Sequence, residues 1–249
     1  FIIACFSDDP CPRLLHELSA KYRHPLSTCP LPCGLPEAEI TAAEQRLGIR
    51  FPVILREYLL TLGSNEAVNQ SFNRLLPLEK MDFDDDYLVL MEENQGVFLC
   101  GIAKADLAQD NPPVHIGFYT DETESYKWQP HLPDTRPLLL ELAYTNAAMG
   151  GLHYCANIMD EESTDAQAIQ FIQQNRTEII ELRQENQRFY TDGFHEIILF
   201  CFAKNGNANG VFIGTADQDR FDTLLELFGW DSWLYTSYDD EDDEECDDE

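Results

Sequence analysis

The sequence predicts an α+β fold, because helical and strand-like segments fall into separate patches along the chain. A doubly wound parallel sheet would instead need strands and helices that alternate strictly. The chain has 249 residues, of which 44% are hydrophobic, so it can bury a substantial core. No run of the sequence approaches the ~20 apolar residues that a membrane-spanning helix needs.

Two short helices are predicted within residues 36–63, each with its own start and stop signals. Pro52 stands where the first residue of the second helix belongs, since its missing N–H is unpaired there in any case. Pro36 opens the first helix, Gly48 closes it, and Gly63 is expected to end the second in a left-handed cap. The residues expected to face the core repeat at helical spacing: Ile40, Ala43, Leu47, Leu55, Tyr58, Leu59 and Leu62.

Strand-like segments follow this helical pair. The runs "YLVLME" (residues 87–92) and "VFLCGI" (97–102) flank a turn and predict a hairpin, and "VHIGF" predicts the next strand. Trp128 is expected to begin an irregular, Pro-rich stretch. Residues 135–151 show helical spacing, and "LHYCANIM" after them predicts a strand.

The C-terminal part alternates between the two kinds of pattern. Thr164, followed three residues later by Gln167, forms a capping-box pattern, and a long amphipathic helix is expected from there to about Phe189. The runs "HEIILFCFA" and "VFIGT" flank Asn-Gly turn residues and predict a second hairpin. Residues 219–230 predict a helix and residues 232–237 a strand. Near the start of the chain, residues 13–22 predict one further helix.

The charge of the chain limits its partners. There are 46 Asp and Glu residues against 16 Lys and Arg, which gives a formal net charge of −30. The last eleven residues hold ten of these acids, so the body without them still carries about −20. Such a surface repels phosphate backbones and anionic lipids, which argues against nucleic-acid and membrane binding. A basic macromolecular partner and simple acidic solubility remain as interpretations.

The eight cysteines indicate neither a disulfide framework nor a metal site. The opening "FIIACF" lacks the basic leader and long apolar region of a signal peptide, so reduced thiols in the cytoplasm are expected. The segment "CPLPC" has a spacing that zinc knuckles can use, but no second tight pair answers it. We therefore expect no metal and no cofactor.

The order of these signals resembles the SUKH superfamily in its Smi/Knr-like form. The resemblance rests on "GLPEAEITAAEQRLGIRFPVILREYLLTLGS", "GVFLCGIAKADLAQDNPPVHIGF" and "PLLLELAYTNAAMGGLHY". It implies a central mixed or antiparallel sheet with flanking helices. We expect an N-terminal extension over residues 1–34, a SUKH-like domain over 35–238 and an acidic tail over 239–249. Within the domain the resemblance is strongest over 35–154 and looser over 155–238. The matching positions are Leu35, Pro36, Glu44, Leu47, Gly48, Phe51, Pro52, Tyr58, Leu59, Leu107, Asp110, Pro112, Pro113 and Val114.

The resemblance also implies a non-enzymatic function. Bacterial members of this superfamily are largely immunity proteins, which bind and block a toxin, often a nuclease. The acidic charge suits a basic toxin, so an immunity protein that neutralises a cognate, basic, nuclease-like polymorphic toxin is the first hypothesis. The alternative is a regulatory interaction module related to fungal proteins of cell-wall signalling.

Two groups of residues are candidates for a site. His153 and Cys155 alternate along a predicted strand and could form a Cys–His nucleophile, although a packed strand without an orienting partner is the favoured interpretation. The acidic turns of the body are preorganised and stand beside aromatic residues, so we expect them to bind the partner. These expected partner-binding residues are Asp82, Asp84, Asp85, Asp86, Tyr87, Glu92, Glu93, Asp121, Glu122, Glu124 and Tyr126.

Overall fold

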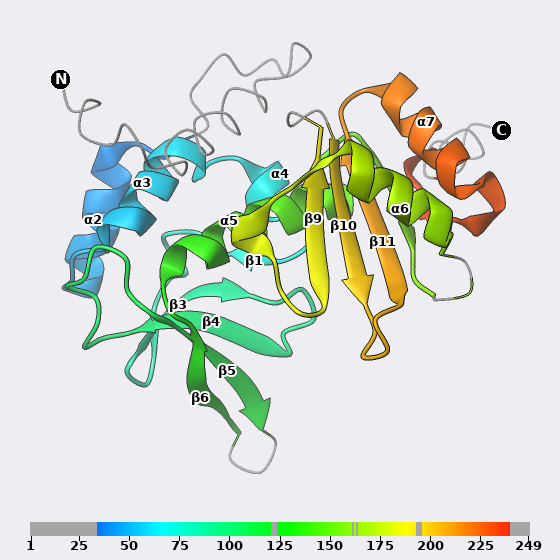
Figure 1. The fold of residues 1–249 in the computed structure, drawn as a ribbon. Helices are drawn as coiled ribbons and strands as arrows, with labels where there is room; N and C mark the ends of the chain where they lie inside the picture. The colour runs from blue at the N-terminus through cyan, green and yellow to red at the C-terminus, as the bar shows by residue number, and fades with distance from the viewer. Residues whose placement is uncertain (1–33, 121–123, 161, 163, 193–195, 240–249) are drawn as a thin grey trace, which may run out of the picture. The chain divides into compact units, whose positions relative to one another are not determined.

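The computed structural model describes residues 34–120, 124–160, 162, 164–192 and 196–239 (Figure 1). These residues pack as two compact units. Unit 1 contains described residues 34–65 and 75–139, and unit 2 contains 66–74 and those from 140 onwards. The single domain expected over 35–238 stays a prediction. The helix expected over 13–22 and most of the acidic tail lie outside the described residues.

The α+β class is confirmed. The described strands form two six-stranded sheets, whereas the resemblance implied one central sheet. The neighbouring strands from β2 to β6 in one sheet, and those of β7 to β12 in the other, pair antiparallel. Among the described residues, no helix combines the length and the hydropathy that crossing a membrane requires.

Unit 1 begins with the predicted helical pair, α2 (Glu37–Leu47) and α3 (Val53–Leu62). Gly48 closes α2 as expected, and it does so with a left-handed φ of 68°. Two details of the prediction were wrong: Pro52 is the N-cap rather than the first helical residue, and Gly63 has a φ of −58°. Gly63 is required for a different reason, since a Cβ there would lie 2.5 Å from the carbonyl oxygen of Leu59.

A buried carboxylate fixes the turn between these helices. The Glu44 side chain is 7% exposed, and its Oε1 accepts a hydrogen bond from the backbone N–H of Phe51 at 2.8 Å. Its Oε2 lies 2.8 Å from Arg56 Nη1 on α3. The second helix then buries Leu55, Tyr58, Leu59 and Leu62, as its spacing predicted. The pair is therefore a scaffold held by apolar burial and by Arg56, which forms ion pairs with both Glu44 and Glu37 of α2.

The sheet of unit 1 follows the order β1-β3-β4-β5-β6, with β2 paired to β3. The hairpin expected from residues 87–92 and 97–102 is present as β3 and β4. The irregular stretch expected at Trp128 is instead the edge strand β6, which pairs along its length with β5. Pro130 misled the prediction; it lies beside a bulge on an edge strand, where a missing N–H is tolerated. The strands are β1 (Arg74–Leu75), β2 (Phe83–Asp84), β3 (Tyr87–Glu92), β4 (Phe98–Ala103), β5 (Val114–Thr120) and β6 (Ser125–Leu132).

Unit 2 is built on a sheet of order β12-β7-β11-β10-β9-β8. Helix α5 (Thr135–Asn146) enters the unit and continues into the π-helical turn η1 (Ala147–Gly151). Helices α6 (Ala166–Asn175) and α7 (Gln218–Phe228) pack on one face of the sheet through a shared apolar cluster. The remaining elements are α4 (Glu66–Asn69), β7 (Tyr154–Ile158), β8 (Thr177–Glu178), η2 (Ile180–Leu182), β9 (Gln187–Thr191), β10 (Glu196–Phe202), β11 (Ala208–Thr215), η3 (Trp230–Ser232) and β12 (Tyr235–Thr236).

The long helix expected from Thr164 to Phe189 was wrong at both ends. The N-cap of α6 is Asp165, whose carboxylate accepts from the N–H of Gln167, while the Thr164 hydroxyl donates to the carbonyl of Ala208. The helix ends at Asn175, and the chain returns as strands β8 and β9. The Phe189 side chain is fully buried on β9, so tertiary packing and not helical periodicity explains its apolar character.

Candidate functional site

One face of the unit 1 sheet carries aromatic side chains instead of a packed core. Because side chains alternate along strands, Leu88, Cys100 and Ile116 point to the buried face. Their neighbours point the other way and bring Tyr87 and Trp128 to the opposite face, where both are half-buried. We call this opposite face of β2 to β6 the open face.

Trp128 is the centre of the open face. Its ring stacks on Tyr87, with centroids 4.5 Å apart and an interplanar angle of 14°. Its indole N–H donates to Asp84 Oδ2 at 2.7 Å. The ring lies against two glycines: a Cβ on Gly117 would fall 2.9 Å from Trp128 Cε2, and one on Gly101 would fall 3.2 Å from Cη2. The glycines therefore make the close approach of the indole possible.

Tyr126 lies beside this centre and next to two carboxylates. Its ring meets Tyr119 edge-on at 5.5 Å, and Tyr119 is 47% exposed. Burial raises the pKa of Tyr126, and the negative charges of Glu92 and Asp84 raise it further. The arrangement is an aromatic surface bordered by acids, and aromatic residues are enriched at the hot spots of protein interfaces.

The structure brings four of the expected partner-binding residues together on the open face: Asp84, Tyr87, Glu92 and Tyr126.

The other expected residues lie in turns, and some of them stabilise the backbone there. Asp82 accepts from the N–H of Phe83, and Glu93 accepts from two backbone N–H groups at 3.0 and 3.1 Å. Asp85 has a positive φ of 51°, and the carbonyl of Asp86 accepts from Lys104. Glu124 is exposed, with a φ of 48°, while Asp121 and Glu122 lie outside the described residues.

Sequence reasoning missed three open-face residues: Trp128, Tyr119 and His115. The His115 ring lies 5.0 Å from Tyr87, so it extends the same aromatic surface. The signal was present in the sequence, because aromatic residues alternate with polar ones through "SYKWQ" as they do in a strand. Pro130 obscured this alternation.

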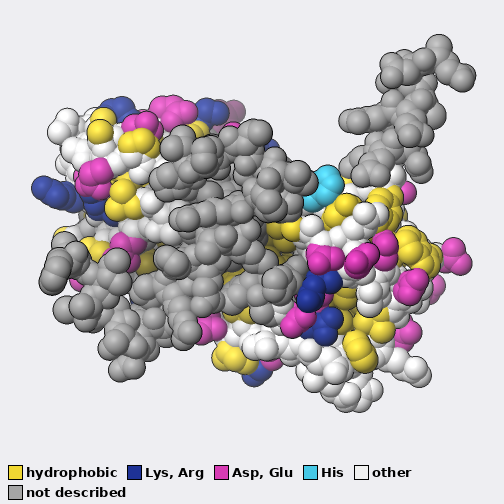
Figure 2. All heavy atoms as spheres, turned by 90° about the horizontal axis from the view of Figure 1, so that it is seen from above, with side chains coloured by type: hydrophobic (Ala, Val, Ile, Leu, Met, Phe, Trp, Pro, Cys, Tyr) yellow, Lys and Arg dark blue, Asp and Glu magenta, His cyan; other side chains and the backbone are white. Residues whose placement is uncertain are grey.

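Acidic charge does not mark the open face by itself. Figure 2 shows Asp and Glu side chains at several separate places on the side of the molecule that it presents. Exposed aromatic side chains that lie beside acids therefore locate the site better than charge does.

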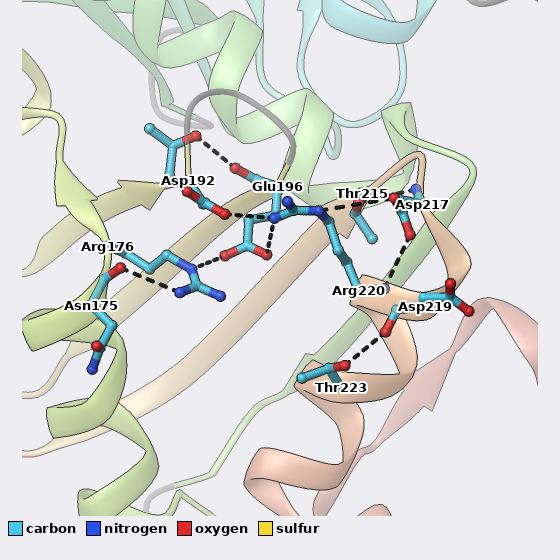
Figure 3. A network of polar contacts seen from close by, with 10 residues as sticks. Asn175, Arg176, Asp192, Glu196, Thr215, Asp217, Asp219, Arg220 and Thr223 are labelled. Atoms are coloured by element: carbon cyan, nitrogen blue, oxygen red, sulfur yellow. Dashed lines mark hydrogen bonds and ion pairs between the residues drawn. The ribbon is translucent and has the colours of Figure 1, made fainter.

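A second polar cluster surrounds Glu196 in unit 2 (Figure 3). The Glu196 side chain is 1% exposed; its carboxylate accepts a hydrogen bond from Arg176 Nε and lies 3.6 Å from Arg220 Nη1. Arg220 Nη1 also donates to Asp192 at 2.6 Å. Because both guanidinium groups face carboxylates of the same cluster, we interpret it as an internal ion-pair network that joins the end of α6 to β10 and the start of α7.

The two residues considered for a Cys–His nucleophile differ in their surroundings. Cys155 is buried in the wall of an apolar cavity of about 300 Å³, whereas His153 is exposed and packs edge-on against Tyr154. This geometry favours a packed strand over a Cys–His pair. Within the part of the chain that the structure describes, no three His, Cys, Asp or Glu side chains converge as metal ligands.

Comparison with known proteins finds a family model that matches part of the chain. The model of the SMI1 / KNR4 family (SUKH-1) matches residues 34–135. We call residues 34–135 the SUKH-1 domain, after the family whose model they match. No curated protein and no solved structure matches the chain. The SUKH-1 match covers all the strands that form the open face.

The same match includes residues 66–74, which cluster with unit 2. Their anchor is Asn146, whose side chain is fully buried at the end of α5. It accepts from the N–H groups of Phe72 and Asn73, and it donates to the carbonyls of Val68 and Asn73.

Proposed function

We propose that the protein is a cytoplasmic immunity protein that binds and neutralises a cognate, basic, nuclease-like polymorphic toxin. The SUKH-1 domain supports a binding role, since the superfamily that the sequence resembles consists largely of toxin-blocking proteins in bacteria. The net charge of −30 supports a basic partner. In this proposal the protein inhibits by binding and catalyses no reaction.

The observation that carries the proposal is the open face of the SUKH-1 domain. Trp128 is fixed between a stacked Tyr87 and a hydrogen-bonded Asp84, so little side-chain entropy is lost when a partner binds there. Tyr119 presents an exposed ring at the edge of the same surface. Aromatic anchors on a rigid sheet contribute most of the affinity of many protein interfaces.

A non-enzymatic regulatory module, related to the fungal signalling proteins, is the second candidate. It would use the same surface, because an interaction module also needs preorganised aromatic anchors. The two candidates differ in the consequence of binding. An immunity protein abolishes the activity of its partner, whereas a regulatory module leaves a partner that is not toxic.

The test is protection of cells by co-expression with a candidate basic toxin chosen from the genes that neighbour this one. Wild-type protein should restore growth, and the double variant Tyr126→Ala/Asp84→Lys should not. Glu57→Lys, on an exposed position of α3, changes charge by the same amount away from the sheet and should still protect. Full protection by a folded double variant would contradict the site, and no protection by the wild type would favour the regulatory module.

A further inference from the structure

We propose that the open face binds an arginine side chain of the partner, with Tyr126 as the aromatic platform and Asp84 and Glu92 as carboxylate acceptors. This inference rests on the proposed function and deepens it, because it names the chemical group that the partner presents.

The first step concerns the aromatic rings. A cation is attracted to the face of an aromatic ring within about 6 Å of its centroid. The protein's own cations lie over rings elsewhere: Lys104 Nζ is 5.2 Å from the centroid of Phe83, and the Arg188 guanidinium is 5.7 Å from that of Phe202. Tyr126, with Tyr119 packed edge-on beside it, offers a ring on the same face of the sheet as Asp84 and Glu92.

The second step concerns charge. The strand register places Asp84 and Glu92 on the same face as Tyr126, and it places no Lys or Arg among the open-face residues of β2 to β6. Lys127 alternates to the opposite face, where it pairs with Phe118. A cation that approaches Tyr126 therefore meets two carboxylates and no competing positive charge from these strands.

The third step distinguishes arginine from lysine. A guanidinium is planar, so it can stack on a ring and still donate paired hydrogen bonds to a carboxylate, which a compact ammonium cannot do. The Asp84 carboxylate is already oriented, because Oδ2 accepts from the Trp128 indole at 2.7 Å and the indole is stacked on Tyr87. A fixed acceptor beside a ring favours the rigid planar donor.

The test uses three short peptides and the full-length protein. The probes are acetyl-Gly-Arg-Gly-amide, its lysine counterpart and its citrulline counterpart, titrated into ¹⁵N-labelled protein and followed by NMR. The signals to follow are the Trp128 indole N–H and the Gly117 amide, since both lie at the centre of the open face. We expect the arginine peptide to bind about threefold or more tightly than the lysine peptide and about tenfold more tightly than the citrulline peptide.

Conservative variants assign the contacts. Asp84→Asn keeps an oxygen that can accept from the indole but removes the charge, and Glu92→Gln does the same at its position. Each should weaken the arginine peptide by about three- to tenfold, and Tyr126→Leu should do so by a similar factor. Glu57→Gln removes one exposed charge from α3 and should change the affinity less than about twofold.

Two results would overturn the inference. Equal affinity for the arginine and lysine peptides would show a plain acidic patch, and equal affinity for the citrulline peptide would show that charge is not recognised. Either result leaves the proposed function standing if the Tyr126→Ala/Asp84→Lys variant still loses protection in cells. Selective arginine binding without any protection by the wild type would instead support the inference and contradict the immunity role.

Discussion

Replacing Asn146 with alanine should destabilise unit 2 by more than an ordinary polar substitution, because one buried amide holds an entire segment. The side chain is 0% exposed and makes four hydrogen bonds to the backbone of residues 68–73. A net contribution of about 0.5–1.5 kcal/mol for each bond gives roughly 2–6 kcal/mol for the four. Three of the bonds are only part-buried, so their backbone partners can regain water in the variant. We therefore expect a loss of about 3–4 kcal/mol in the free energy of unfolding.

The assay combines urea denaturation with hydrogen exchange. The amides of Phe72 and Asn73 donate to the Asn146 side chain, so both should lose protection in the variant before the rest of unit 2 does. Asn175→Ala is the matched control, because that exposed amide makes one hydrogen bond to the carbonyl of Phe171 and should cost less than about 0.5 kcal/mol. A loss below about 1 kcal/mol for Asn146→Ala, with unchanged exchange at both amides, would refute the reasoning.

Three further predictions concern the core and the titratable groups. Leu59→Ala removes a side chain that is 1% exposed and should cost about 2–5 kcal/mol in urea unfolding; unchanged stability would mean that α3 does not bury this face. Burial raises the pKa of Glu141 against the opposing hydrogen bonds from Gln187 and Gln184, so this group's contribution to stability is lost as pH rises from its ordinary pKa of 4.5 through the raised folded value. Between these two pKa values, the free energy of unfolding should fall less with rising pH in Glu141→Gln than in the wild type. An identical pH dependence in the two proteins would contradict the assignment. Burial also raises the pKa of Cys201 to about 11, so iodoacetamide should not alkylate it at pH 7.5 in the native protein but should do so after denaturation; rapid native labelling would disprove this.

Local signals predicted α2 and α3 well, since the ends of these helices depend on neighbouring residues. Pro36, Gly48 and Pro52 place the ends of α2 and the start of α3 to within one residue. The hairpin of β3 and β4 was equally predictable, because a short turn fixes its partner strands.

Features that depend on distant contacts could not be predicted in the same way. The chain from Arg176 to Phe189 has apolar residues at spacings that suit a helix, yet it forms strands because β9 pairs with β10. No local signal places residues 66–74 in unit 2, since their anchor is Asn146, more than 70 positions away.

The sequence allowed several residues of the candidate site to be predicted, but not the residue at its centre. Asp84, Tyr87, Glu92 and Tyr126 could be chosen from the sequence because acidic turns stand beside aromatic residues. The alternation in "SYKWQ" could have placed Trp128 on a strand, but its position at the centre of the site depends on the pairing of β6 with β5 and on the space that Gly117 and Gly101 leave for its ring.

The most direct test of the central claim is the dissociation rate of the purified complex with the cognate toxin. We expect Tyr126→Ala and Asp84→Asn each to speed dissociation by about tenfold or more, with a small change in the association rate, and Glu57→Gln to leave both rates within about twofold of the wild type. Dissociation from the two folded open-face variants at the wild-type rate would contradict the claim that the open face of the SUKH-1 domain holds the partner.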